Sequence, residues 1–210
     1  MAARLRSFCN QGRREGGDWY EHTTLGTNYR LSGLQAALLL VQLERLGEQN
    51  ARRSAHAQRL LRGLASCPGL VPLTVDARVT SHTNYLVILR YRPEGFALLD
   101  RAGFLAAVQA EGIPFLPGYP YPLYRNPLFT GRALHPRGCP AGCLLCARGV
   151  DYSRLNLPAS EQACREALWL EHQVLLGETS DVDDVLEAIE KIRRQAEVVK
   201  QAWARRSAHG

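Results

Sequence analysis

Three cysteines and a histidine stand close together in the C-terminal half of the sequence. Cys139, Cys143 and Cys146 form a Cys-x3-Cys-x2-Cys pattern, and His135 precedes them. Thiolates and an imidazole at such spacings can converge on one Zn²⁺ ion, so these four side chains are candidate metal ligands. The alternative is that they are reduced thiols in a Pro- and Gly-rich segment. The spacing also resembles the iron–sulfur motif of radical enzymes that use S-adenosylmethionine, but no barrel precedes it here.

A second candidate site is the polar loop of residues 26–30, Gly-Thr-Asn-Tyr-Arg, which runs into a predicted helix start. Asn28, Tyr29 and Arg30 place an amide, a phenol and a guanidinium beside backbone N–H groups that have no helical partner. Such a set of donors suits a phosphate group. The alternative is an ordinary surface loop in which Arg30 pairs with a carboxylate.

Few other residues are candidates for covalent or acid–base chemistry. Only Lys191 and Lys200 of the 26 basic residues are lysines. The histidines outside the cysteine cluster stand singly, and His82, at the start of a predicted strand, is a candidate to line an active-site cleft.

A long helix is predicted over residues 32–66, either continuous or in two parts joined at Gly47. Ser32 and Gln35 have the spacing of a capping box at its start. The Ala-Ala-Leu-Leu-Leu-Val run at 36–41 is apolar on every side of a helix, so we expect it to be buried between two layers.

After the long helix, predicted strands and helices alternate along the sequence, which indicates an α/β domain. Strands are predicted within 70–75 and 84–91, and an extended run over 113–116. Helices are predicted over 100–111 and 161–167, followed by an apolar stretch over 168–176. A last helix begins near Ser180, which we expect to be its N-cap, and the chain ends in a basic tail. Residues 117–158 are predicted to be irregular and to line a site or cross a surface.

Composition excludes several classes of protein. Of 210 residues, 46% are hydrophobic and 22% charged, as in ordinary folded proteins. No apolar run approaches the roughly 20 residues that span a bilayer, and the first residues lack the pattern of a secretory signal, so we expect a cytoplasmic protein without a membrane segment. The net charge of +6 comes from arginines scattered along the chain, which argues against nucleic-acid binding.

Several separated motifs resemble the DegT/DnrJ/StrS family of sugar and aminocyclitol aminotransferases, which depend on pyridoxal 5'-phosphate. The motifs occur in the family's order and cover roughly residues 6–194. They are NQGRREGGDWYEHTTLGTNYRLSGLQAALLLVQLERL, AEGIPF, GYPYPLYRNPLF, ACREALWL and DVDDVLEAIEKI. GYPYPLY is most similar to the branch that aminates keto-inositols such as scyllo-inosose.

The resemblance implies the C-terminal part of a fold-type I aminotransferase. We expect residues 1–31 to end the large domain, 32–66 to be an interdomain helix, 67–196 to be a small α/β domain and 197–210 to be a basic tail. The implied reaction transfers an amino group from glutamate or glutamine to a keto-sugar or keto-cyclitol. The family's Schiff-base lysine has no counterpart here, so we expect this chain alone to be inactive.

The resemblance also assigns residues. Asn28 and Arg30, with Tyr29, match the loop that reaches the cofactor phosphate of the neighbouring subunit, and Tyr119 lies in a stretch that matches a substrate-contacting segment. His82, which the resemblance does not assign, is the second substrate candidate, and its alternative is a local hydrogen bond. Gly118 stands where sugar-aminating members have histidine, and Glu171 stands where the family often has proline, which we interpret as a local variation. The expected partner is a second copy or a separately encoded N-terminal half.

Two alternatives remain. One is a non-catalytic remnant that at most dimerises or complements another half, and the other is a small zinc-stabilised binding module. If no sheet covers the apolar 36–41 run, we expect the chain to be poorly soluble and prone to self-association.

Overall fold

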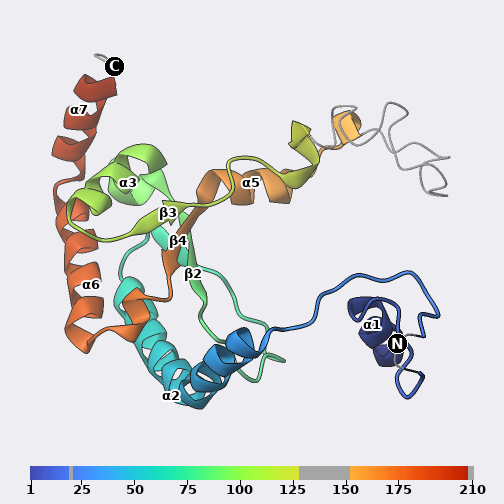
Figure 1. The fold of residues 1–210 in the computed structure, drawn as a ribbon. Helices are drawn as coiled ribbons and strands as arrows, with labels where there is room; N and C mark the ends of the chain where they lie inside the picture. The colour runs from blue at the N-terminus through green and yellow to red at the C-terminus, as the bar shows by residue number, and fades with distance from the viewer. Residues whose placement is uncertain (19–20, 128–151, 208–210) are drawn as a thin grey trace. The chain divides into compact units, whose positions relative to one another are not determined.

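The computed structural model describes residues 1–18, 21–127 and 152–207, and divides the chain into two compact units, Met1–Gln49 and Asn50–Gly210 (Figure 1). These units are defined by contacts between residues. The domains expected from the family resemblance are a separate matter and stay predictions.

The first unit contains helix α1 (Ala2–Cys9), the 26–30 loop and the start of helix α2 (Gly33–Leu64), which continues into the second unit. The capping box predicted for α2 is confirmed. The backbone N–H of Gln35 donates to Ser32 Oγ at 3.2 Å, and the backbone N–H of Ser32 donates to Gln35 Oε1 at 3.0 Å. Two backbone N–H groups at the helix start are thereby satisfied.

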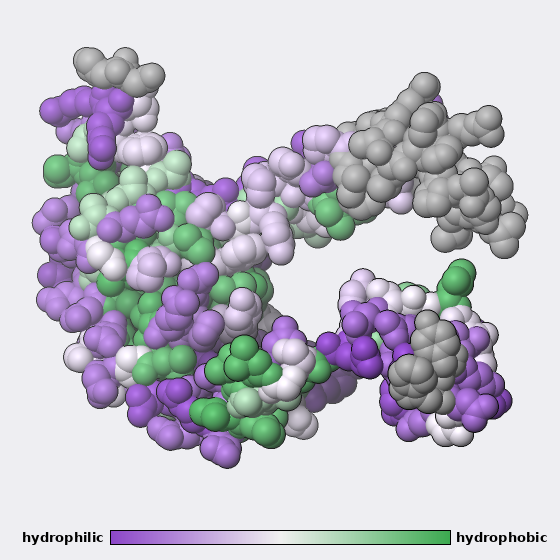
Figure 2. Space-filling view, viewed as in Figure 1, coloured by the Kyte–Doolittle hydropathy of each residue, from purple (hydrophilic) through white to green (hydrophobic). Residues whose placement is uncertain are grey.

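The expected burial of the 36–41 run is wrong for this chain. Leu38, Leu40 and Val41 are each more than half exposed, because none of the described residues covers this part of α2. Figure 2 shows hydrophobic side chains gathered over the first half of the helix. Burial in α2 begins only in its second half, with Arg53, Ala57, Leu60 and Leu64.

The second unit is built on a four-stranded sheet in the order β1-β2-β4-β3. The strands are β1 (Leu70–Pro72), β2 (Leu86–Tyr91), β3 (Phe115–Pro117) and β4 (Ala167–Glu171). Every neighbouring pair is antiparallel, so β2 and β3 run parallel on either side of β4. Helix α3 (Arg101–Ala110) connects them, which makes a split β-α-β unit.

Alternation along the strands gives the sheet two different faces. Val87, Leu89, Leu168 and Leu170 lie on the covered face and are almost completely buried. They share a core with side chains of α2, α3 and α6 (Thr179–Arg194), including Leu60, Phe104, Val108, Val185 and Ile189. The other face we call the open face; its residues are half-buried or exposed, and are Leu86, Ile88, Arg90, Leu116, Ala167, Trp169 and Glu171.

Two features of the C-terminal helices differ from expectation. The N-cap of α6 is Glu178 and not Ser180, because the Glu178 and Asp181 side chains form a reciprocal capping box. The residues expected as a basic tail begin with helix α7 (Ala196–Ser207), where Trp203 Nε1 donates to Asp100 Oδ2 at 3.2 Å. In Figure 1, α6 and α7 follow one another along one side of the second unit, beside α3.

The remaining elements are α5 (Pro158–Glu166), which leads into β4, and the short 3-10 helices η1 (Pro93–Phe96), η2 (Leu123–Arg125), η4 (Tyr152–Arg154) and η5 (Val174–Leu176). Within the part of the chain that the structure describes, no helix combines the length and the apolar character that a bilayer crossing requires.

Candidate cofactor and substrate sites

The 26–30 loop is fixed along the end of α1 by backbone hydrogen bonds. Thr27 N donates to Phe8 O at 2.8 Å and Tyr29 N to Cys9 O at 2.9 Å. Two glycines permit this close approach. A Cβ on Gly26 would lie 2.3 Å from Gly12 N, and Gly12 itself has a φ of +75°, a conformation that favours glycine.

Asn28 and Arg30 contact each other within this loop. Arg30 Nε donates to Asn28 Oδ1 at 3.0 Å, and the Arg30 backbone N–H donates to the same oxygen at 3.4 Å. Among the described residues, the terminal guanidinium nitrogens of Arg30 and the amide nitrogen of Asn28 have no hydrogen-bond partner. Arg30 is therefore oriented through Nε while its remaining donors are available for an anion.

A cavity of about 350 Å³ lies beside this pair in the first unit. Its lining combines three arginines with one acidic residue, and consists of Arg6, Ser7, Cys9, Asn10, Arg13, Glu15 and Arg30. The acid is already engaged, since Arg6 Nε donates to Glu15 Oε2 at 3.1 Å. The excess of donors and positive charge fits a phosphate group, including that of pyridoxal 5'-phosphate.

Tyr29 takes no part in this pair. Its side chain is 73% exposed, so the described structure gives it no packing role against α2.

The two substrate candidates lie in the second unit. His82 is exposed in the loop before β2, where its Nδ1 accepts a hydrogen bond of 3.1 Å from the backbone N–H of Asn84. It lines a cavity of about 270 Å³. Tyr119 follows β3 and packs edge-on against Trp169 of β4, with ring centroids 4.9 Å apart and planes at 87°.

Trp169 is a residue that the sequence reasoning missed. The available signal was the alternation in Ala-Leu-Trp-Leu-Glu, which places Trp169 on the face opposite Leu168 and Leu170. The contact between Trp169 and Tyr119 depends on the pairing of Leu116 with Trp169, so it can be predicted only when the register of the sheet is known.

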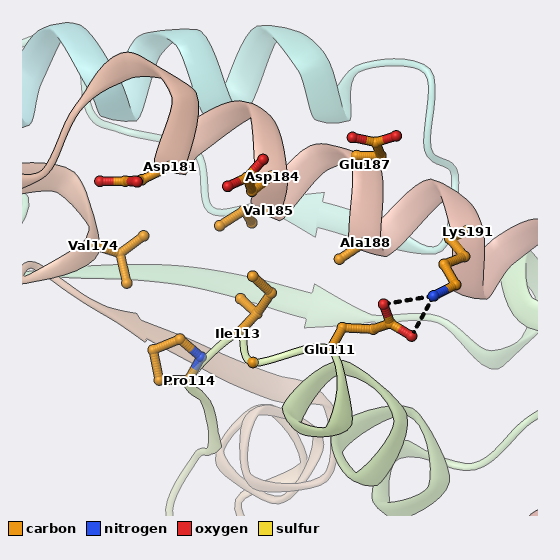
Figure 3. Close-up of a pocket in the computed structure, with 11 residues that line it drawn as sticks. Glu111, Ile113, Pro114, Val174, Asp181, Asp184, Val185, Glu187, Ala188 and Lys191 are labelled. Carbon is orange, nitrogen blue, oxygen red and sulfur yellow. Dashed lines mark hydrogen bonds and ion pairs between the residues drawn. The ribbon is translucent and has the colours of Figure 1, made fainter.

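A further cavity is separate from all of these residues. It measures about 600 Å³ and lies between α6 and the connection from α3 to β3 (Figure 3). Lys191 Nζ closes one end by donating to both carboxylate oxygens of Glu111 at 2.8 Å each. The other lysine, Lys200, donates to Ala97 O at 2.8 Å.

The metal candidates His135, Cys139, Cys143 and Cys146 lie outside the described residues, so a zinc site there stays a prediction. Of the cysteines within the described residues, Cys67 is buried, and burial raises the pKa of its thiol. Cys9 and Cys164 are half-buried.

Comparisons with known proteins agree on one family. A protein of Streptoalloteichus tenebrarius, a proposed L-glutamine:3-amino-2,3-dideoxy-scyllo-inosose aminotransferase, is 37% identical over 202 residues, covering 94% of this chain and 48% of its own. The L-glutamine:2-deoxy-scyllo-inosose aminotransferase of Streptomyces paromomycinus is 37% identical over 172 residues, covering 81% and 39%. The chain thus spans about half the length of the curated relatives that it matches.

Solved structures also match most of this chain over less than half of their own length. DesV of S. venezuelae matches with a TM-score of 0.66 and 30% identity, covering 93% of this chain and 44% of its own. 3-Amino-5-hydroxybenzoic acid synthase matches with a TM-score of 0.68 and 25% identity, covering 90% and 46%. The expected fold class, a partial α/β fold of a pyridoxal-phosphate aminotransferase, is confirmed.

The family model for the DegT/DnrJ/EryC1/StrS aminotransferases matches residues 1–190. Together with the relatives, this match shows that the chain belongs to the DegT/DnrJ/EryC1/StrS aminotransferase family.

Proposed function

We propose that the chain works as part of a pyridoxal 5'-phosphate-dependent aminotransferase that moves an amino group from glutamine or glutamate to a keto-cyclitol. A keto-sugar is the second acceptor class. The names of the relatives support both, because they include inosose aminotransferases and a dTDP-amino-sugar transaminase of Streptomyces venezuelae.

The observation that carries the proposal is the Asn28–Arg30 pair. Arg30 would bind the cofactor phosphate through its terminal nitrogens, while Asn28 holds the guanidinium through Nε and contributes its own amide N–H groups. The bound cofactor supplies the electron sink of the reaction. Tyr119 and His82 would contact the acceptor.

The chain also needs a partner under this proposal. Its two lysines are already engaged, Lys191 with Glu111 and Lys200 with a backbone carbonyl, and neither lies beside the 26–30 loop in sequence. The lysine that bonds to the cofactor would then come from another polypeptide segment. We propose a homodimer of the complete enzyme, or assembly with a separately encoded N-terminal half.

The phosphate role is tested with pyridoxamine 5'-phosphate, which has no aldehyde to react with the lysines. In isothermal titration calorimetry, the 210-residue chain should bind pyridoxamine 5'-phosphate more tightly than pyridoxamine, which lacks the phosphate. Arg30→Ala should weaken it about tenfold or more, because a charge-assisted contact is lost. Arg14→Ala is the matched control, because Arg14 pairs with Glu21 at 2.9 Å in the same unit. Unchanged affinity in Arg30→Ala would contradict the proposal.

The need for a partner is tested by activity. The chain alone should not transaminate 2-deoxy-scyllo-inosose with glutamine, whereas co-expression with the upstream half of the S. paromomycinus relative should restore the reaction. Amination by the chain alone would show that the lysine argument is wrong.

A further inference from the structure

Arg53 of α2 is the single charged side chain that is buried among the described residues, with 9% of its surface exposed. A buried charge is costly unless an opposite charge and hydrogen bonds compensate it. Arginine cannot avoid this cost by losing its proton, because the guanidinium stays charged in proteins. The partners of Arg53 therefore decide whether it stabilises the chain.

The described residues give Arg53 few partners. Its Nη2 donates to the amide oxygen Oδ1 of Asn50, which is neutral. Its Nε is buried and has no hydrogen-bond partner within the described part of the chain. No carboxylate there forms an ion pair with it, whereas Arg59 of the same helix donates to Asp183 at 2.7 and 2.8 Å. Arg53 is thus a buried cation without an anion.

Arg53 lies where the covered part of α2 begins, because it is the first buried residue along this helix. Helical side chains lean toward the N-terminus of their helix, and the hydrogen bond to Asn50 places the guanidinium on that side. Leu46, seven positions earlier and therefore on the same side of α2, is 41% exposed. A polypeptide that packs on the uncovered turns would meet the guanidinium at the edge of its contact.

We propose that the polypeptide that completes the enzyme covers the first half of α2 and places a carboxylate, from an aspartate or a glutamate, against Arg53. The inference rests on the proposed function, which requires such a partner, and adds the chemistry of the contact. The partner presents an apolar surface to the leucines of α2 and one acid at the edge of that surface. The guanidinium offers its donors in a planar fork that matches a carboxylate.

A polypeptide accounts for two observations that a small anion does not explain together. A free phosphate or carboxylate would compensate the charge of Arg53 but would leave the leucines of α2 exposed. The chain spans about half the length of its relatives, so the complete enzyme contains enough further polypeptide to form this cover.

The proposal predicts opposite effects of one substitution. Arg53→Met removes the charge and keeps an unbranched side chain of nearly the same helix propensity. In the chain alone, it should raise the urea midpoint by about 0.5 M, because an unpaired charge is no longer buried. In the assembled protein, it should weaken association about tenfold or more, because the partner's carboxylate loses its cation.

Urea unfolding of the 210-residue chain, followed by far-ultraviolet circular dichroism, measures the first effect. For the second, a tagged chain is co-expressed with the upstream half of the S. paromomycinus relative, and the amount of that half that co-purifies is compared. Arg53→Met should retain about a tenth or less, and Arg53→Lys, which keeps the charge, should retain more. The matched control is Arg62→Met, at an exposed arginine in the last turn of α2, which should alter neither measurement.

A rise of the urea midpoint together with a loss of co-purification supports the inference. It is overturned if Arg53→Met does not raise the midpoint, if this variant retains the upstream half as well as the unmodified chain does, or if the unmodified chain retains none. A failure of the proposed function is measured separately, by the Arg30 titration with pyridoxamine 5'-phosphate. Arg30-dependent binding without an effect of Arg53→Met would remove this inference alone.

Discussion

Two arginines converge on the half-buried carboxylate of Glu166. Arg90 and Arg92 both donate to it, at 2.8 and 2.7 Å, and its side chain is only 14% exposed. Burial alone would raise the pKa of Glu166, but hydrogen bonds from Arg90 and Gln162 and the charge of Arg92 hold it below the ordinary value of 4.5. A carboxyl whose pKa is lowered by folding stabilises the protein above that ordinary value and loses this effect as the pH falls.

We therefore expect Glu166→Gln to lower the free energy of unfolding by about 1–2 kcal/mol at pH 7. The difference from the unmodified chain should shrink as the pH falls below 4.5 and Glu166 becomes protonated. Urea unfolding at pH 7 and at pH 3.5 measures it, with the exposed Glu94→Gln as control. A difference of equal size at both pH values would show that the charge of Glu166 is not what stabilises this corner.

Local contacts were predictable from the sequence, and distant ones were not. Asn28 and Arg30 are two positions apart, so their proximity follows from the chain itself. Trp169 and Tyr119 are fifty positions apart, and their contact depends on which strands pair and in what register. That is why sequence reasoning found Tyr119 only through the family resemblance and missed Trp169.

At the scale of elements, helices and strands were found near their predicted positions, and their ends were less accurate. Ser180 has the residue type of an N-cap, but Glu178 and Asp181 satisfy two backbone N–H groups together. Glu178 N donates to Asp181 Oδ2 at 2.8 Å. A reciprocal pair outcompetes a single hydroxyl, which residue type alone could not indicate.

Removing each side chain tests this assignment. Asp181→Ala should lower the free energy of unfolding by about 1 kcal/mol, because an N-terminal backbone group of α6 loses its partner. Ser180→Ala should stay within about 0.5 kcal/mol of the unmodified chain, as an exposed substitution does. Thermal and urea unfolding compare the two. Equal losses would favour Ser180 as a cap after all.

At the scale of the whole molecule, the first half of α2 has an apolar surface that nothing in the described residues covers. Leu38 and Leu43 are 63% and 62% exposed. The sequence pattern correctly marked this run as one that needs a cover, since it is apolar on every side. The family resemblance added the expectation that the covering sheet belongs to the large domain, and within the described residues this surface is indeed uncovered.

We expect the purified chain to self-associate through this surface. The double variant Leu38→Glu, Leu43→Glu should run as a monomer in size-exclusion chromatography with light scattering. Its urea unfolding should be unchanged, because neither side chain is buried. Val198→Glu, at a residue 66% exposed on α7, is the control and should associate like the unmodified chain. A monodisperse unmodified monomer would contradict the prediction.

The strand order also determines when the sheet can be completed. β4 is the last strand to be made, yet it lies between β2 and β3. During synthesis, β2 has one unpaired edge and β3 has no partner until residue 171 has left the ribosome. The core of the second unit must therefore form late and through long-range pairing, which is slow and leaves strand edges open to other nascent chains.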